Sequence, residues 1–208
     1  MSQSQRQQRL RLLVKKLNQE RKQRGKQVDI LCNDLIAANR DFVQRLEGIG
    51  FAAGFYKALL GTTDLRTLLM RATRLIEQEL PGAGVSFFLR HDGPCRLLSL
   101  DNRDRSRLRR PSVEDCLSAE MVESICKSNR RCTIDDMVNM GLEGNQQLLS
   151  DVSMVTLPLS DLGRALGFVL LHRPMPRQLS REEANKVGLI TCGLSHAIRS
   201  CRTPAPMS

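Results

Sequence analysis

Apolar residues recur at different spacings along the chain, and each spacing predicts a different kind of element. Over residues 152–161 they alternate loosely with polar residues, whereas residues 165–171 are almost wholly apolar. A short polar turn that contains Asp161 and Gly163 separates the two runs. This pattern predicts a β-hairpin over residues 152–172, and the continuous apolar run predicts that its second strand is covered on both faces.

The residues after this hairpin predict a capped amphipathic helix. Ser180 and Glu183 stand three positions apart at the start of a helical periodicity, which is the pattern of a capping box. We therefore expect one closing helix over residues 180–200. Its expected buried face consists of Ala184, Val187, Ile190, Leu194, Ala197, Ile198 and Cys201.

The N-terminal part of the chain follows the 3–4 spacing of a helix with a narrow apolar seam. From Leu10 to Leu59, twelve of the fifteen positions in this register are apolar. Arg21 and Arg24 interrupt the seam beside Gly25, so we expect a break or kink near residues 24–26. Two copies of the chain would pair along the better part of the seam, whereas the alternative is that this arm packs on its own domain. The seam residues singled out for pairing are Val28, Leu31, Leu35, Phe42 and Ile49.

Turn and capping residues divide the next part of the chain. Gly61 ends the long helix, Asp64 and the two threonines before it cap a second helix, and Pro81 with Gly82 stops that helix. Residues 85–90 and 96–100 read as two strands joined by a turn rich in Gly and Pro, which predicts another hairpin.

Residues 101–151 predict fewer regular elements. The arginine-rich residues 101–110 form an expected solvated loop. Ser112 is expected to cap a helix that carries Leu117, Met121, Val122 and Ile125. Residues 131–134 form a short predicted strand, and an irregular segment follows, with a short helix near residues 145–149.

The net charge of +10 is concentrated in the N-terminal arm, because residues 1–27 contain nine Lys or Arg against a single acid. Such an arm can contact the phosphates of nucleic acid, or an anionic lipid or acidic partner. The basic residues singled out are Arg9, Lys15, Lys16, Arg21, Lys22 and Arg24.

The seven cysteines are odd in number and irregularly spaced, without a Cys-x-x-Cys pair. No apolar run approaches the roughly 20 residues that a membrane span needs, and no apolar block follows the basic N-terminus. We therefore expect reduced thiols and a cytoplasmic protein. Cys95 and Cys132, which lie beside turns, are the candidates for a reactive thiol, whereas Cys192 and Cys201 fit an apolar helix face.

From residue 64 onward the expected order is helix, hairpin, helix, short strand, irregular segment, hairpin, helix. This order resembles that of a GAF domain. So do Pro158-Leu159, Leu162-Gly163 and the run Gly-Phe-Val-Leu-Leu at residues 167–171. The resemblance covers residues 64–202. It implies an α+β fold with an antiparallel sheet of five or six strands and flanking helices. The expected division is a helical arm at residues 1–61, a GAF-like domain at 62–202 and a disordered tail at 203–208.

The resemblance also implies a function. GAF domains commonly bind small molecules between the sheet and the helices near residues 112–149, and many serve as dimerisation modules. The residues expected to line such a pocket are Leu117, Met121, Ile134, Met137 and Leu148. The motifs of the cyclic-nucleotide-binding, bilin-binding and redox members of the family are missing.

No pattern of residues predicts catalysis or a metal. The three histidines, His91, His172 and His196, have no partner at metal-ligand spacing, and neither a phosphate-binding loop nor a nucleophile elbow occurs. We therefore expect a non-catalytic sensory or regulatory module without a metal or cofactor. It would form a homodimer through its arm and bind a small ligand or a signalling protein. The alternatives are a nucleic-acid-binding regulator that uses the arm and, as a third hypothesis, a thiol enzyme.

Overall fold

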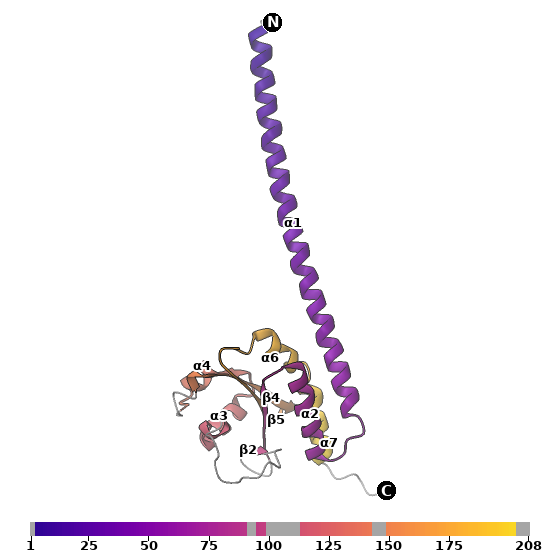
Figure 1. Ribbon diagram of the computed structural model, residues 1–208, viewed down its shortest axis with the longest axis vertical. Helices are drawn as coiled ribbons and strands as arrows, with labels where there is room; N and C mark the ends of the chain where they lie inside the picture. Colours follow the sequence, from indigo (N-terminus) through magenta and orange to yellow (C-terminus); the bar gives the residue numbers. More distant parts are fainter. Residues whose placement is uncertain (1–2, 91–94, 99–112, 143–148, 203–208) are drawn as a thin grey trace. The chain divides into compact units, whose positions relative to one another are not determined.

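The computed structural model describes residues 3–90, 95–98, 113–142 and 149–202 (Figure 1). The chain divides into two compact units, Met1–Gly48 and Ile49–Ser208. Helix α1, Gln3–Leu59, supplies the whole described part of the first unit and the first element of the second.

Helix α1 is continuous through residues 24–26, so the expected break at this point is wrong. Gly25 lowers helix stability by about 1 kcal/mol, but it keeps the backbone N–H that the hydrogen-bond ladder needs. Its neighbours Lys22, Arg24 and Lys26 are good helix formers. Because helix growth is cooperative, one weak position among strong ones does not end the helix.

The second unit is built on a five-stranded antiparallel sheet in the order β2-β1-β5-β4-β3. The strands are β1 (Gly84–Arg90), β2 (Cys95–Leu98), β3 (Cys132–Thr133), β4 (Val152–Asp161) and β5 (Arg164–Pro174). The central strand β5 pairs with β1 and β4 along most of its length. Both predicted hairpins are confirmed, and the α+β sheet with flanking helices is the expected fold.

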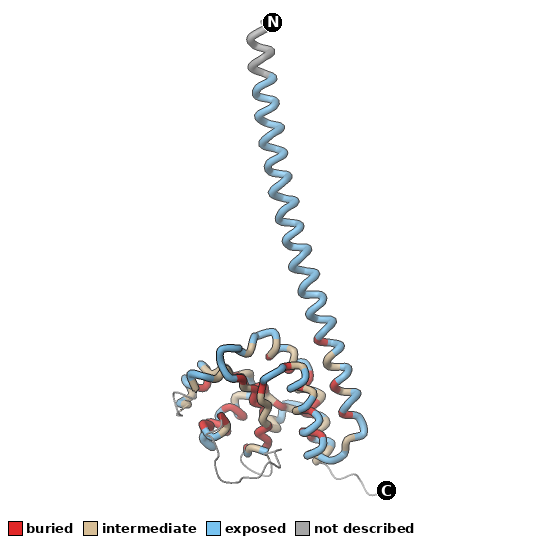
Figure 2. The backbone as a smooth tube through the Cα atoms, in the orientation of Figure 1, coloured by how far each residue is buried: buried red, intermediate tan, exposed pale blue. Residues whose placement is uncertain are grey.

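Helices cover both faces of this sheet (Figure 1). They are α2 (Leu65–Glu79), the 3₁₀ turn η1 (Val113–Cys116), α3 (Ala119–Ser128), α4 (Ile134–Asn139), α6 (Arg181–Gly188) and α7 (Thr191–Arg202). Alternate residues of β5 face opposite layers, as the two-residue period of a strand requires. Val169 and Leu171 join a core with α2, α6 and α7, whereas Phe168 and Leu170 join a core with α3 and α4. Figure 2 shows the buried residues gathered in the strands and on the helix faces toward them.

The last turns of α1 belong to the second unit. Phe55 and Leu59 are buried in the core shared with α2 and α7, and the Tyr56 hydroxyl donates to the Leu189 carbonyl at 3.0 Å. The sequence placed the end of the arm at residue 61, whereas the second unit of the structure begins at Ile49.

Helix α3 begins later than expected. Its N-cap is Ser118, whose side chain accepts the Met121 amide at 3.2 Å, so the assignment of the cap to Ser112 is wrong. The residues between form η1, which places the side chain of Glu114 against β1 and β5.

The closing helix is two helices, α6 and α7, and not one. The capping box of Ser180 and Glu183 is confirmed. At the break, side chains take over from backbone donors: the Thr191 hydroxyl donates to the Gly188 carbonyl at 2.9 Å, and Tyr56 donates to Leu189. Because these carbonyls have partners outside the helical ladder, the chain can turn here without leaving them unsatisfied.

Candidate functional site

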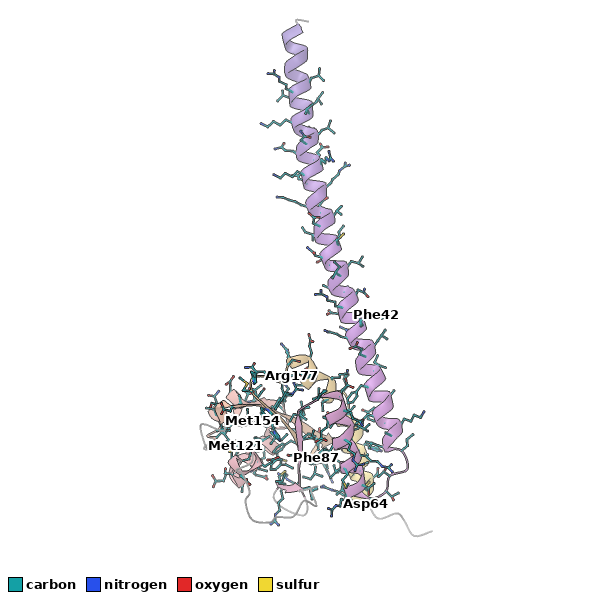
Figure 3. All side chains as sticks on the ribbon, in the orientation of Figure 1. Phe42, Asp64, Phe87, Met121, Met154 and Arg177 are labelled. Atoms are coloured by element: carbon teal, nitrogen blue, oxygen red, sulfur yellow. The ribbon has the colours of Figure 1, made fainter. Side chains whose placement is uncertain are left out.

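The candidate site is an apolar layer between the sheet and helices α3 and α4, here called the α3-side layer. In Figure 3, Met121 and Met154 lie in this part of the unit, whereas Phe87 lies closer to α2. The Phe88 and Phe168 rings stack within the layer, with their centroids 4.7 Å apart. The layer consists of Phe88, Cys95, Val113, Leu117, Met121, Val122, Ile125, Cys126, Cys132, Met137, Met154, Phe168 and Leu170.

The structure brings together four of the five residues that the sequence singled out for a pocket. Leu117, Met121 and Met137 are buried in the α3-side layer, and Ile134 packs against it. Leu148 lies outside the described residues. Met137 is 0% exposed and is covered by its protein neighbours, so a ligand would enter this layer by displacing side chains. The flexible, unbranched methionines, Met121, Met137 and Met154, suit such a displacement.

Helix α4, which carries Met137, was not expected from the sequence. Thr133 and Asp136 form a capping box: the Asp136 carboxylate accepts the Thr133 amide at 2.8 Å, and the Thr133 hydroxyl accepts the Asp136 amide. Thr-x-x-Asp before an apolar pair is a variant of the Ser/Thr-x-x-Glu/Gln capping pattern, and this variant could have predicted the start of α4 from the sequence. The short helix expected near residues 145–149 and the loop at 101–110 fall on ranges that the structure does not fully describe.

A polar cluster lies at the border of the layer, between β1, β5 and η1. Glu114 accepts a hydrogen bond from the Ser86 hydroxyl, and its Oε1 lies 3.6 Å from Nε2 of His172. These contacts, with the hydrogen bond from His172 as the largest cause, lower the pKa of Glu114 to about 2. A Cβ on Gly84 would lie 2.4 Å from the His172 ring, so glycine at this position lets the ring approach the backbone. Ser86 contacts the carboxylate and not the histidine, so the cluster is not arranged as an activated nucleophile.

The opposite end of β1 carries a second polar group beside two buried thiols. Nη2 of Arg90 lies 2.5 Å from Oε1 of Glu123 on α3. Cys95, one of the two predicted reactive thiols, is buried at the start of β2 and contacts Cys126. Cys132, the other candidate, is buried with its sulfur 3.6 Å from the Ser128 hydroxyl.

The seam residues of α1 are exposed in the single chain, from Val28 through Leu35 to Ile49. Among the basic residues, Arg11, Lys15 and Lys22 border one open strip of helix surface together with Leu10 and Val14. The side chain of Arg9 lies outside the described part of the chain. Lys16, Arg21 and Arg24 are exposed on the same helix.

No model of a known protein family matches this sequence, and no curated protein is significantly similar to it. Solved structures do match. The GAF domain of a phosphoenolpyruvate-protein phosphotransferase from Coxiella burnetii aligns over 76% of this chain and 95% of its own, with 16% identity and a TM-score of 0.55. The fold of the second unit is GAF-like.

Two further solved structures resemble the fold of this chain. The GAF domain of the phosphoenolpyruvate-protein phosphotransferase from Acinetobacter aligns over 74% of this chain and 93% of its own, with 10% identity and a TM-score of 0.53. Residues 122–287 of a methyl-accepting chemotaxis protein align over 75% and 99%, with 15% identity and a TM-score of 0.52. At these identities the likeness concerns the fold.

Two features are absent from the described residues. Within the described ranges, no helix combines the length and apolar content that crossing a bilayer requires. In the same ranges, no group of three or more His, Cys, Asp or Glu side chains is placed to hold a metal ion.

Proposed function

We propose that this protein is a non-catalytic, cytoplasmic sensory or regulatory module. Its GAF-like domain binds a small ligand or a signalling protein, and α1 joins two copies of the chain. The observation that carries the proposal is the methionine-lined α3-side layer within a GAF-like fold. The similar domain of a methyl-accepting chemotaxis protein supports a sensory role.

Ligand binding is tested by thermal unfolding of the full chain against a panel of small, mainly apolar compounds. A compound that binds only the folded state raises the unfolding midpoint, and above its Kd the rise grows with the logarithm of its concentration. Met137→Phe fills the α3-side layer and is expected to abolish the shift. The matched control is Val138→Phe, because Val138 is the next residue of α4 and its side chain is exposed. A shift that Met137→Phe leaves intact, or a panel without any shift, contradicts binding in this layer.

Dimerisation is tested by light scattering on the full chain after size exclusion. Leu35 is 71% exposed and lies on the heptad seam, whereas the adjacent Ile36 is 53% exposed and lies off it. Burying Leu35 between two helices stabilises a dimer by about 2 kcal/mol for each side chain, and a buried Asp reverses this gain. We expect Leu35→Asp to be monomeric and Ile36→Asp to remain dimeric. A monomeric wild-type chain contradicts the proposal.

A second candidate function is nucleic-acid binding by the basic arm, and the strip bordered by Arg11, Lys15 and Lys22 favours it. Each phosphate contact contributes about 0.9 to the slope of log affinity against log salt. Changing these three residues to Gln is expected to lower the slope on a generic duplex by about 2 to 3. Gln at the exposed Arg164, Arg177 and Arg181 removes the same charge from the GAF-like domain and leaves the slope unchanged. Equal loss in both variants, or no binding at low salt, excludes the arm as the binding element.

A further inference from the structure

Two cysteines that are far apart in the sequence meet at the border of the α3-side layer. Cys95 is the first residue of β2 and pairs with Arg90 across the β1–β2 ladder. Cys126 lies on α3, one helical turn after Glu123. The Glu123 carboxylate joins the two elements, because one oxygen contacts Arg90 and the other accepts the Cys95 amide at 3.5 Å. The sequence did not indicate this pair, since contact between β2 and α3 is a product of the fold.

The two thiols belong to one buried cluster, and their side chains interact. Both are shielded from solvent. Cys95 is 6% exposed and Cys126 is 1% exposed. All seven cysteines lie in the described part of the chain and carry reduced thiols. Two thiols on separate elements can form an intramolecular disulfide when their Cα atoms lie about 4.4–6.8 Å apart.

The surroundings make the two sulfurs chemically unequal. The hydrogen bond with Cys95, followed by the charge of Arg90, lowers the pKa of Cys126. The same hydrogen bond and burial raise the pKa of Cys95. Because the thiolate is the reactive form of cysteine, Cys126 is the sulfur that reacts first, and Cys95 is the thiol beside it that can complete a disulfide.

We propose that Cys95 and Cys126 form a redox-active dithiol, which hydrogen peroxide oxidises to a disulfide that joins β2 to α3. In the first step the Cys126 sulfur attacks one peroxide oxygen, the O–O bond breaks, and a sulfenic acid and one water form. In the second step the Cys95 sulfur attacks the Cys126 sulfur, the S–O bond breaks, and the hydroxide leaves as a second water with the Cys95 proton. The two thiols lose two electrons, and the peroxide gains them. Oxidation by peroxide would act on the domain without a bound ligand.

The test is thiol counting and peptide mapping on the full chain after exposure to hydrogen peroxide. The exposed Cys32 and Cys192 are first changed to Ser, which leaves five cysteines of the seven. We expect the loss of two thiols, a mass decrease of two hydrogens and recovery of both thiols with dithiothreitol. Trypsin then yields residues 91–96 linked to a peptide that ends at Lys127. Fragmentation distinguishes Cys126 from Cys116, which lies on the same peptide.

Single substitutions in the same background separate the two roles. Cys126→Ser is expected to abolish the disulfide, whereas Cys95→Ser leaves a sulfenic acid on Cys126 that dimedone traps. Cys132→Ser is the matched control, because Cys132 is a buried thiol of the same layer, and it is expected to retain the disulfide. The proposal is overturned if peroxide leaves all five thiols reduced or if mapping places the bond on any other pair. Since the mapping uses the chain with Cys95 and Cys126 intact, a variant that fails to fold does not obscure the result.

Discussion

At the scale of single residues, the sheet depends on positions where a side chain cannot be accommodated. Gly167 of β5 has φ +147°, and a Cβ there would lie 1.9 Å from the Phe88 carbonyl oxygen. The neighbouring register shift between Leu159 and Ser160 shows that β4 and β5 are irregular at this level. Glycine at position 167 thus permits a close approach of the central strand to β1.

Gly167→Ala is therefore expected to lower the free energy of unfolding by more than about 3 kcal/mol, because backbone atoms have to move. Gly188→Ala is the control: Gly188 ends α6 with open space around its Cα, and alanine there changes stability by less than about 1 kcal/mol. Urea denaturation followed by the fluorescence of Tyr56, the single tyrosine, measures both variants. Equal effects of the two substitutions would contradict the steric argument.

Glu114 makes the free energy of unfolding depend on pH in the acidic range. The pKa of Glu114 is lowered from 4.5 to about 2, so the charged carboxylate is more stable in the folded state than in the unfolded state. The contribution is fully present above pH 4.5 and is lost as the pH falls toward 2. It is on the order of 3 kcal/mol.

Glu114→Gln is expected to remove this contribution near neutral pH and to flatten the loss of stability on acidification. Glu120→Gln, at an exposed acid in the first turn of α3, is the control and keeps the wild-type profile. Urea midpoints between about pH 6 and about pH 2.5 give the comparison. A Glu114→Gln chain with an unchanged acid profile would show that the Ser86 and His172 contacts do not favour the charged carboxylate.

At the scale of elements, the surroundings of α1 change along its length. Its last turns supply Phe55 and Leu59 to the core of the GAF-like domain, whereas the seam from Val28 to Ile49 is exposed in the single chain. The 3–4 apolar spacing continues through both regions, because the same helical period suits packing on a domain and pairing with a second helix.

Two phenylalanines of this helix provide a direct comparison. Phe55 is 1% exposed and Phe42 is 59% exposed. Phe55→Ala is expected to destabilise the GAF-like domain by about 3 to 5 kcal/mol, because it leaves a cavity in a packed core. Phe42→Ala is expected to leave domain unfolding unchanged and to weaken association. Urea denaturation measures the first effect and light scattering the second, and a domain that tolerates Phe55→Ala would contradict the assignment of these turns to its core.

At the scale of the whole molecule, the proposed functional features lie in different parts of the chain. The ligand layer and the Cys95–Cys126 pair belong to the GAF-like domain, and the pairing seam belongs to α1. Residues 10–47 of α1 are exposed in the single chain, and long helices of this kind draw most of their stability from packing. If two copies pair along the proposed seam, the helix content of α1 therefore follows their association.

Dilution of the full chain is expected to lower the far-ultraviolet helical signal in step with dissociation, while the Tyr56 fluorescence of the folded domain stays constant. The physical reason is mass action: two copies stabilise the helix only when they are paired. Circular dichroism over a wide concentration range, compared with Leu35→Asp at the same concentrations, measures the effect. A helical signal that is independent of concentration and equal in both chains would contradict stabilisation by pairing.

Local patterns in the sequence determined much of the fold. The apolar run of residues 165–171 identified the central strand, Asp64 and Ser180 marked helix starts, and Gly61 marked the end of α1, because strand burial and helix capping depend on neighbouring residues. These elements in order were enough for the resemblance to GAF domains. The clustering of Leu117, Met121 and Met137 followed from that resemblance.

Only the tertiary structure decided features that depend on distant residues. At the break between α6 and α7, the Leu189 carbonyl accepts a hydrogen bond from Tyr56, more than 130 positions away in the chain. Similarly, the lowered pKa of Glu114 depends on His172 and Ser86, and the meeting of Cys95 with Cys126 depends on how β2 packs against α3. Periodicity reports which face of an element is buried, and capping reports where a helix starts. Neither reports which residues lie against that face. The partners of these side chains are therefore a property of the fold.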